Sequence, residues 1–218
     1  MRTLRMFPLG SVLFPTMVLP LHVFEPRYRA LTVDCLRDDR TFGVVLIERG
    51  NEVGGGDVRT DVGTAARIVD AEELPDGRWT VVAVGTDRFR VTEWLEDDPY
   101  PRARVEDWPE PDDAPPPERA AFESLVGEAR RIMALASEAN VSSGPATAEV
   151  TDDPVLGTWQ LAAMSPLGPL DRQELLTTPD AAGRIALLSS QLDDARSVLV
   201  ARINDLGGGP PNTPPDLR

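Results

Sequence analysis

Hydrophobic positions dominate the start of the chain. Between Arg5 and Glu25 the sequence carries no charged residue, and most positions are apolar. Pro8, Pro15 and Pro20 interrupt this stretch, and each removes a backbone donor that a helix would need. We therefore predict two short extended segments joined by a loop, with the prolines at strand ends or sheet edges.

A helical period begins at Pro26. Tyr28, Leu31 and Leu36 recur at helical spacing behind a proline that suits the first turn of a helix. The opening of the chain thus predicts strand, loop, strand and helix. Two alternatives are a secretory leader and a membrane span behind Arg2, but the leader's small-residue cleavage site is missing and the prolines interrupt a spanning helix.

The middle of the chain has the pattern of short strands. A β-branched run over Thr41–Glu48 predicts a strand buried on both faces. The segments 62–74 and 78–84 flank a Pro-Asp-Gly turn and predict a hairpin. Two further strands are expected over 88–93, after a Gly-Thr-Asp break, and over 100–106. Five or six such strands can form a small barrel, which the opening stretch would close.

The second half of the chain is helical. Residues 108–117 hold five prolines in ten positions and predict a linker. Beyond it, apolar residues follow a helical stripe over 122–136, Asp152 or Asp153 can cap a helix that starts at Pro154, and the longest stripe runs from Ile185 to Leu199. The Gly- and Pro-rich end of the chain predicts disorder.

Several separated motifs resemble one known family in the same order. They are FPLGSVLFPTMVLPLHVFEPRYRAL, FGVVLIERG, GTAARIVDAEELPDGRWTVVAVGTDRFRV and SPLGPLDRQELL. Over about residues 4–204 the chain is similar to the amino-terminal substrate-recognition domain of Lon-type ATP-dependent proteases. The resemblance implies an α+β fold, in which an N-terminal β-rich, PUA-like pseudobarrel precedes a C-terminal helical bundle with one long final helix. In the full protease this domain engages protein substrates.

Pattern and resemblance together predict four regions. They are a β-rich subdomain at 1–108, a Pro-rich linker at 109–117, a helical subdomain at 118–206 and a disordered tail at 207–218.

Composition narrows the range of partners. The chain has 218 residues, and its 36 acidic residues against 22 basic ones give a net charge of −14. Nucleic-acid binding and attachment to anionic membranes both depend on basic surfaces, so we expect neither partner. A single cysteine, Cys35, forms no intrachain disulfide and fits a reducing cytoplasm. The oligomeric state does not follow from the composition.

Candidate chemistry is sparse. With one histidine, His22, and one cysteine, the chain has no His or Cys cluster of metal-ligand spacing, and we expect no metal and no cofactor. Gly54–Gly56 are followed by Asp57 rather than by the lysine of a phosphate-binding loop. All 22 basic residues are arginines. The resemblance implies a lysine in both the peptidase and the ATPase steps of Lon, so neither step is expected here.

Three functions remain open. The first is a non-catalytic module that binds exposed apolar segments of unfolded or partner proteins and can feed a separate protease. The second is small-ligand binding in the cleft between barrel and bundle, and the third is an unrecognised hydrolase. For the first we expect binding through apolar residues of the opening stretch and one arginine: Phe14, Met17, Leu19, Phe24, Arg27 and Tyr28.

Overall fold

The computed structural model describes residues 1–49 and 58–207. Six strands are present in these ranges: β1 (Arg2–Leu9), β2 (Val18–Val23), β3 (Thr41–Arg49), β4 (Val58–Glu73), β5 (Trp79–Leu95) and β6 (Arg102–Asp107). Five helices accompany them: α1 (Pro26–Arg37), α2 (Arg119–Glu138), α3 (Pro154–Met164), α4 (Pro169–Thr177) and α5 (Ala181–Gly207). The predicted glycine loop at 54–56 and residues 208–218 of the predicted tail lie outside the described residues.

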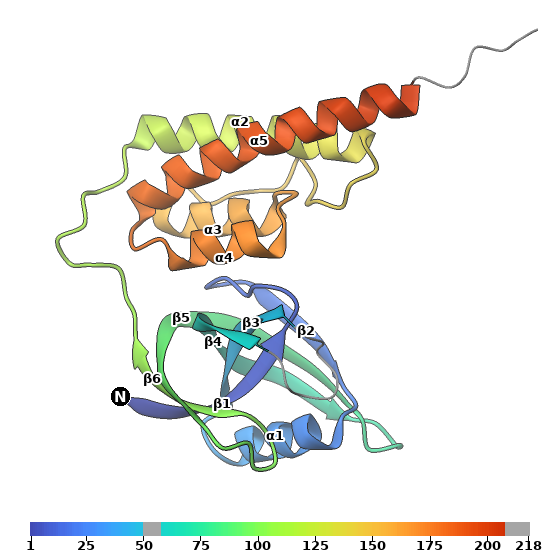
Figure 1. Ribbon diagram of the computed structural model, residues 1–218, viewed down its shortest axis with the longest axis vertical. Coiled ribbons are helices and arrows are strands. Elements are labelled where there is room, and N and C mark those ends of the chain that lie inside the picture. The colour runs from blue at the N-terminus through green and yellow to red at the C-terminus, as the bar shows by residue number, and fades with distance from the viewer. Residues whose placement is uncertain (50–57, 208–218) are drawn as a thin grey trace, which may run out of the picture.

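The elements form two parts of different kinds, a strand-rich part and a helical part (Figure 1). The strands make a barrel, with α1 at the end far from the other helices, and α3 and α4 lie between the barrel and the α2–α5 pair. This arrangement confirms the predicted α+β fold, with its β-rich first part, helical second part and long final helix. The order strand, loop, strand, helix at the start of the chain is also confirmed.

The opening stretch closes the barrel through β1. The sheet order is β2-β5-β4-β3-β1-β6, and an additional pairing of β5 with β6 completes the circle. The first half of β1 pairs antiparallel with β6, and its second half pairs parallel with β3. β2 stands outside this circle, because within the described residues it pairs with β5 alone.

β5 corrects one sequence prediction. The expected break over residues 85–87 does not divide the chain into two strands, because β5 runs without interruption from Trp79 to Leu95. Gly85 instead allows the backbone of the loop before β2 to come close to β5. A Cβ at this position would lie 2.4 Å from the carbonyl oxygen of Phe14. A shift in the β4–β5 register falls at the same place.

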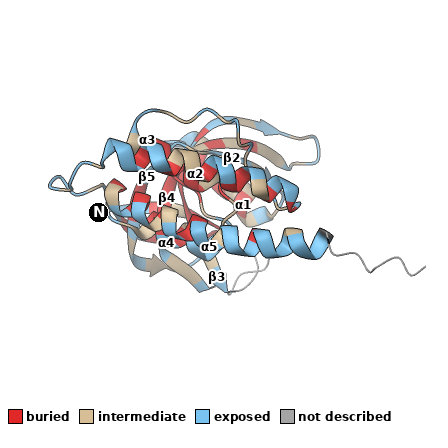
Figure 2. Cartoon of the chain, turned by 90° about the horizontal axis from the view of Figure 1, so that it is seen from above, coloured by how far each residue is buried: buried red, intermediate tan, exposed pale blue. Residues whose placement is uncertain are grey.

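The helices follow their sequence signals. Asp153 accepts hydrogen bonds from the backbone N–H groups of Val155 and Leu156, so it is the N-cap expected before Pro154. Figure 2 shows that exposed residues predominate toward the C-terminal end of α5, beyond the bundle. The main cluster of buried residues joins all four C-terminal helices, and it also includes two residues from the barrel half of the chain, Phe14 and Val62.

Candidate functional site

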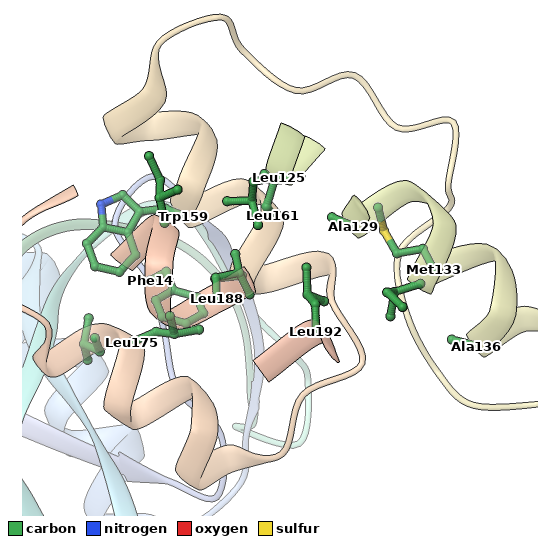
Figure 3. Packing of buried hydrophobic residues seen from close by; sticks show 14 of the residues in the cluster. Phe14, Leu125, Ala129, Met133, Ala136, Trp159, Leu161, Leu175, Leu188 and Leu192 are labelled. Carbon is green, nitrogen blue, oxygen red and sulfur yellow. The ribbon is translucent and has the colours of Figure 1, made fainter. Parts of the chain in front are cut away.

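The loop between β1 and β2 is held against both halves of the molecule. Phe14 is 1% exposed, and its ring stacks on Trp159 of α3 at a centroid distance of 5.3 Å (Figure 3). The Thr64 hydroxyl donates a hydrogen bond to the Leu13 carbonyl at 2.6 Å. Two backbone hydrogen bonds at 2.8 and 2.9 Å tie residues 16 and 17 to Gly85. The loop is therefore a structural joint between barrel and bundle.

Two of the expected binding residues are core residues. Phe14 fills the helical core, and Tyr28 is 4% exposed and stacks on Phe7 with 4.1 Å between ring centroids. Burial of these aromatic rings stabilises the fold itself, and direct contact of a client protein with Phe14 or Tyr28 stays a prediction.

Met17 and Leu19 lie between core and surface. Both are half-buried. Leu19 is the register partner of Ala83, which is fully buried, so its side chain points to the barrel interior. Met17 packs against both the helical and the barrel clusters. These two residues therefore present only part of their apolar surface to solvent.

The exposed apolar residues occupy alternating positions. Val18 is 64% exposed and Phe24 is 55% exposed. Pro20 and His22 between them are exposed as well, so one side of β2 and of the residue after it faces outward. Val18 and Pro20 were missed in the sequence analysis. The signal that could have found them is the alternation of the two sides of a strand within the uncharged stretch.

A slot of about 200 Å³ opens beside this exposed side. Its walls come from the end of β1, from β2 and from the start of α1: Phe7, Pro8, Leu9, Pro20, Leu21, His22, Val23, Phe24, Glu25 and Tyr28. Arg27 borders it, since its guanidinium lies 4.5 Å from the Tyr28 ring centroid and its Nε donates to Glu25 at 3.0 Å. The slot is apolar and aromatic with one ion pair at its rim, which suits an apolar side chain better than a charged one.

A second cavity, of about 390 Å³, lies at the junction of barrel and bundle. It is lined by Pro15, Thr86, Asp87, Arg88, Asp107, Trp108, Pro109, Glu110 and Trp159. Arg88 is 5% exposed and donates hydrogen bonds to the carbonyls of Leu176, Thr178 and Pro179. Burial, with a smaller contribution from nearby Arg184, lowers the pKa of Arg88 to about 10.

Within the described part of the chain, neither the single cysteine nor the single histidine forms a reactive centre with its neighbours. Cys35 is fully buried, its thiol donates to the Thr41 carbonyl, and burial raises its pKa to about 12, which disfavours the nucleophilic thiolate. His22 is exposed on β2. Within the described residues, no group of three or more His, Cys, Asp or Glu side chains is placed to hold a metal ion.

The comparison with known proteins identifies the family. Residues 3–194 match the model of the ATP-dependent protease La (LON) substrate-binding domain. The chain belongs to the Lon substrate-binding domain family. Lon protease 2 of Myxococcus xanthus is 32% identical over 196 residues, which is 87% of this chain and 23% of that protein. The chain therefore spans about a quarter of the length of such relatives.

Solved structures agree with this family. The crystal structure of a Lon N-terminal domain protein from Xanthomonas campestris has a TM-score of 0.67 and 30% identity, over 87% of this chain and 98% of that one. The N-terminal domain of Lon protease from the Mycobacterium avium complex has a TM-score of 0.57 at 16% identity, which supports the fold alone. In residues 1–49 and 58–207, no helix is both long and apolar enough to cross a membrane.

Proposed function

We propose that this Lon-family domain is a non-catalytic recognition module that binds exposed apolar segments of unfolded or partner proteins. The observation that carries the proposal is the exposure of Phe24, which lines an apolar slot, together with the exposure of Val18 on β2. Exposed apolar side chains that border a concave surface are typical of protein-binding sites. A separate protease would then act on the bound client.

The residues of the proposed surface come from the opening stretch. Phe24 supplies an aromatic contact, and Met17 and Leu19, which pack against the buried clusters, contribute only the parts of their side chains that reach solvent. Arg27 is held by Glu25 at 3.0 Å and orients polar groups of the client at the rim. Phe14 and Tyr28 are each stacked on a second aromatic ring, and we propose that they hold the loop before β2 and the start of α1 in place. We propose cytoplasmic clients, in keeping with the lone buried Cys35.

Binding to unfolded α-casein tests the proposal directly. Fluorescence anisotropy of labelled casein should rise on addition of the domain. Phe24→Ser should weaken this binding, whereas Leu170→Ser, which alters a residue 65% exposed on α4, should not. Equal binding by the two variants and the unaltered domain, or no binding at all, would refute the proposed surface.

Absence of catalysis is part of the same proposal. The family's ATPase and peptidase steps both need lysine, and all 22 basic residues of this chain are arginines. The purified chain should release neither phosphate from ATP nor peptides from casein. Turnover that co-purifies with the domain through several chromatographic steps would contradict this part of the proposal.

The junction cavity supports a second candidate function, the binding of a small ligand. Two tryptophans, Trp108 and Trp159, line a space of about 390 Å³ that Glu110 also lines. A ligand that enters this space should quench tryptophan fluorescence and raise the melting temperature. A compound screen in which no ligand changes both signals would remove this candidate.

A further inference from the structure

The outer face of the sheet carries an apolar surface that continues from β2 onto the neighbouring strands. Val18 is the register partner of Val84, and Pro20 is the partner of Val82. Register partners in an antiparallel pair project on the same side of the sheet. Along β5, residues 81 and 83 are buried in the barrel while Val82 and Val84 are half-buried, so these two valines point outward with Val18 and Pro20.

A register shift in β4 adds one more valine to this face. Ile68 pairs with Ala83 and Asp70 pairs with Val82, so Val69 is the extra residue between them. Its side chain is 53% exposed. A bulged residue leaves the alternation of the strand and can turn outward, as it does here. We call the five residues Val18, Pro20, Val69, Val82 and Val84 the valine face.

We propose that the valine face is a contact surface for an extended, aliphatic segment of a client protein. This inference rests on the proposed recognition function and specifies the substrate class: a client strand with β-branched or leucine side chains laid across β2, β5 and β4. The exposed apolar area of five small side chains is on the order of a few hundred Å², the size of functional patches on monomeric proteins. Polar residues lie on the same face beside the valines, since Arg67 is the register partner of Val84 and Asp70 is that of Val82.

A client segment fits this face better than a second copy of the chain. A stable dimer needs about 800 Å² from each partner, which exceeds what the valine face offers. Pairing of two β2 edges is also disfavoured, because Pro20 lacks the N–H group that a new strand would bind. A short segment that lies flat on the valines requires neither a large area nor a free edge. The face therefore suits transient binding.

Two valines of β4 provide a matched test. Val69 and Val58 are 53% and 51% exposed, but Val58 pairs with Arg49 at the other end of the strand, away from the valine face. Val69→Glu should weaken binding of labelled α-casein by about fivefold or more, as expected for a charge placed in an apolar contact. Val58→Glu should leave the affinity within about twofold of the unaltered domain. Circular dichroism should show that both variants are folded. If the Val69→Glu variant is not folded, the Val69→Thr variant is tested in its place.

The outcomes separate this inference from the proposed function. Casein binding that is weakened by Phe24→Ser but unchanged by Val69→Glu refutes the valine face and leaves the recognition function in place. Equal losses in the Val69 and Val58 variants also refute it, because the effect would then be one of net charge. Failure of the unaltered domain to bind casein refutes both. A dimer in sedimentation analysis that Val69→Glu converts to a monomer would assign the face to a second copy instead.

Discussion

Phe14 and Phe24 belong to the same uncharged stretch, yet their environments are opposite. Phe14 is 1% exposed and fills the core of the helical bundle, whereas Phe24 is 55% exposed beside the slot. Both follow short apolar runs of similar composition. The difference arises because the loop before β2 enters the space between barrel and bundle, while β2 itself lies at the edge of the sheet. Within twenty residues, apolar side chains of one stretch therefore lie in two environments, the buried core and the exposed surface.

Phe14→Ala should have the largest effect on stability. Removing a buried ring that stacks on Trp159 leaves a cavity, and the free energy of unfolding should fall by about 3–5 kcal/mol. Phe24→Ala is the matched control and should change it by less than about 0.5 kcal/mol, as is usual at exposed positions. Urea denaturation followed by circular dichroism measures both. If both variants lost a similar free energy of unfolding, Phe14 and Phe24 would not differ in their contribution to stability.

Arg88→Met should weaken the joint between the two halves. The substitution keeps an apolar stem but leaves the carbonyls of Leu176, Thr178 and Pro179 without their donor, at a cost of about 3 kcal/mol. Arg90→Met is the control, because Arg90 is exposed although it contacts the same Trp108 ring. Urea denaturation should show a large fall in the free energy of unfolding for Arg88→Met and a small one for Arg90→Met. Equal stability would mean that the carbonyls find other donors.

The double variant Met17→Asp, Leu19→Ser measures how far the loop tip belongs to the core. Because both side chains are half-buried and pack against buried clusters, we expect a loss of about 2–3 kcal/mol in the free energy of unfolding. An unchanged melting temperature together with lost casein binding would instead place both residues fully in the binding surface. The measurement therefore shows how far the loop tip belongs to the core and how far to the proposed surface.

Cys35 gives a smaller, pH-dependent effect in the barrel core. Its folded-state pKa is raised to about 12 from an ordinary value of 9.0, mainly by burial. Since the unfolded thiol ionises first, the stability that Cys35 contributes is complete below about pH 9 and is lost as pH rises toward 12. Cys35→Ala should therefore lose less stability between pH 8 and pH 10.5 than the unaltered chain. Parallel losses in both would show that other groups cause the alkaline destabilisation.

Local signals predicted most of the fold. The prolines at 8, 15 and 20 excluded a helix at the start of the chain, and Asp153 with Pro154 marked the start of α3. The Gly85 region was interpreted wrongly because a glycine in a strand can mark either a turn or a close approach of another segment. The contact that decides it, with the Phe14 carbonyl, comes from a residue more than seventy positions earlier. The predicted division of the chain into two subdomains at the linker 109–117 stays a prediction. Phe14 comes from the first subdomain but packs in the core of the second.

The candidate site was less predictable. The uncharged stretch contains the exposed residues Val18 and Phe24, but the six residues expected to bind divide into buried, half-buried and exposed ones. Tyr28 is buried because α1 covers the far end of the barrel, and Val69 is exposed because β4 bulges. A single sequence contains neither fact, since both depend on which strands pair and in which register.

Sequence alone determined the element types of this protein, its lack of lysine, its negative charge and the location of its most apolar segment. These properties depend on the residues themselves or on neighbours within a few positions. Tertiary structure decided which of those apolar residues face solvent, because burial depends on contacts such as Phe14 with Trp159 and Val18 with Val84. Pairing across such distances in the chain placed the valines of three strands on one outer face.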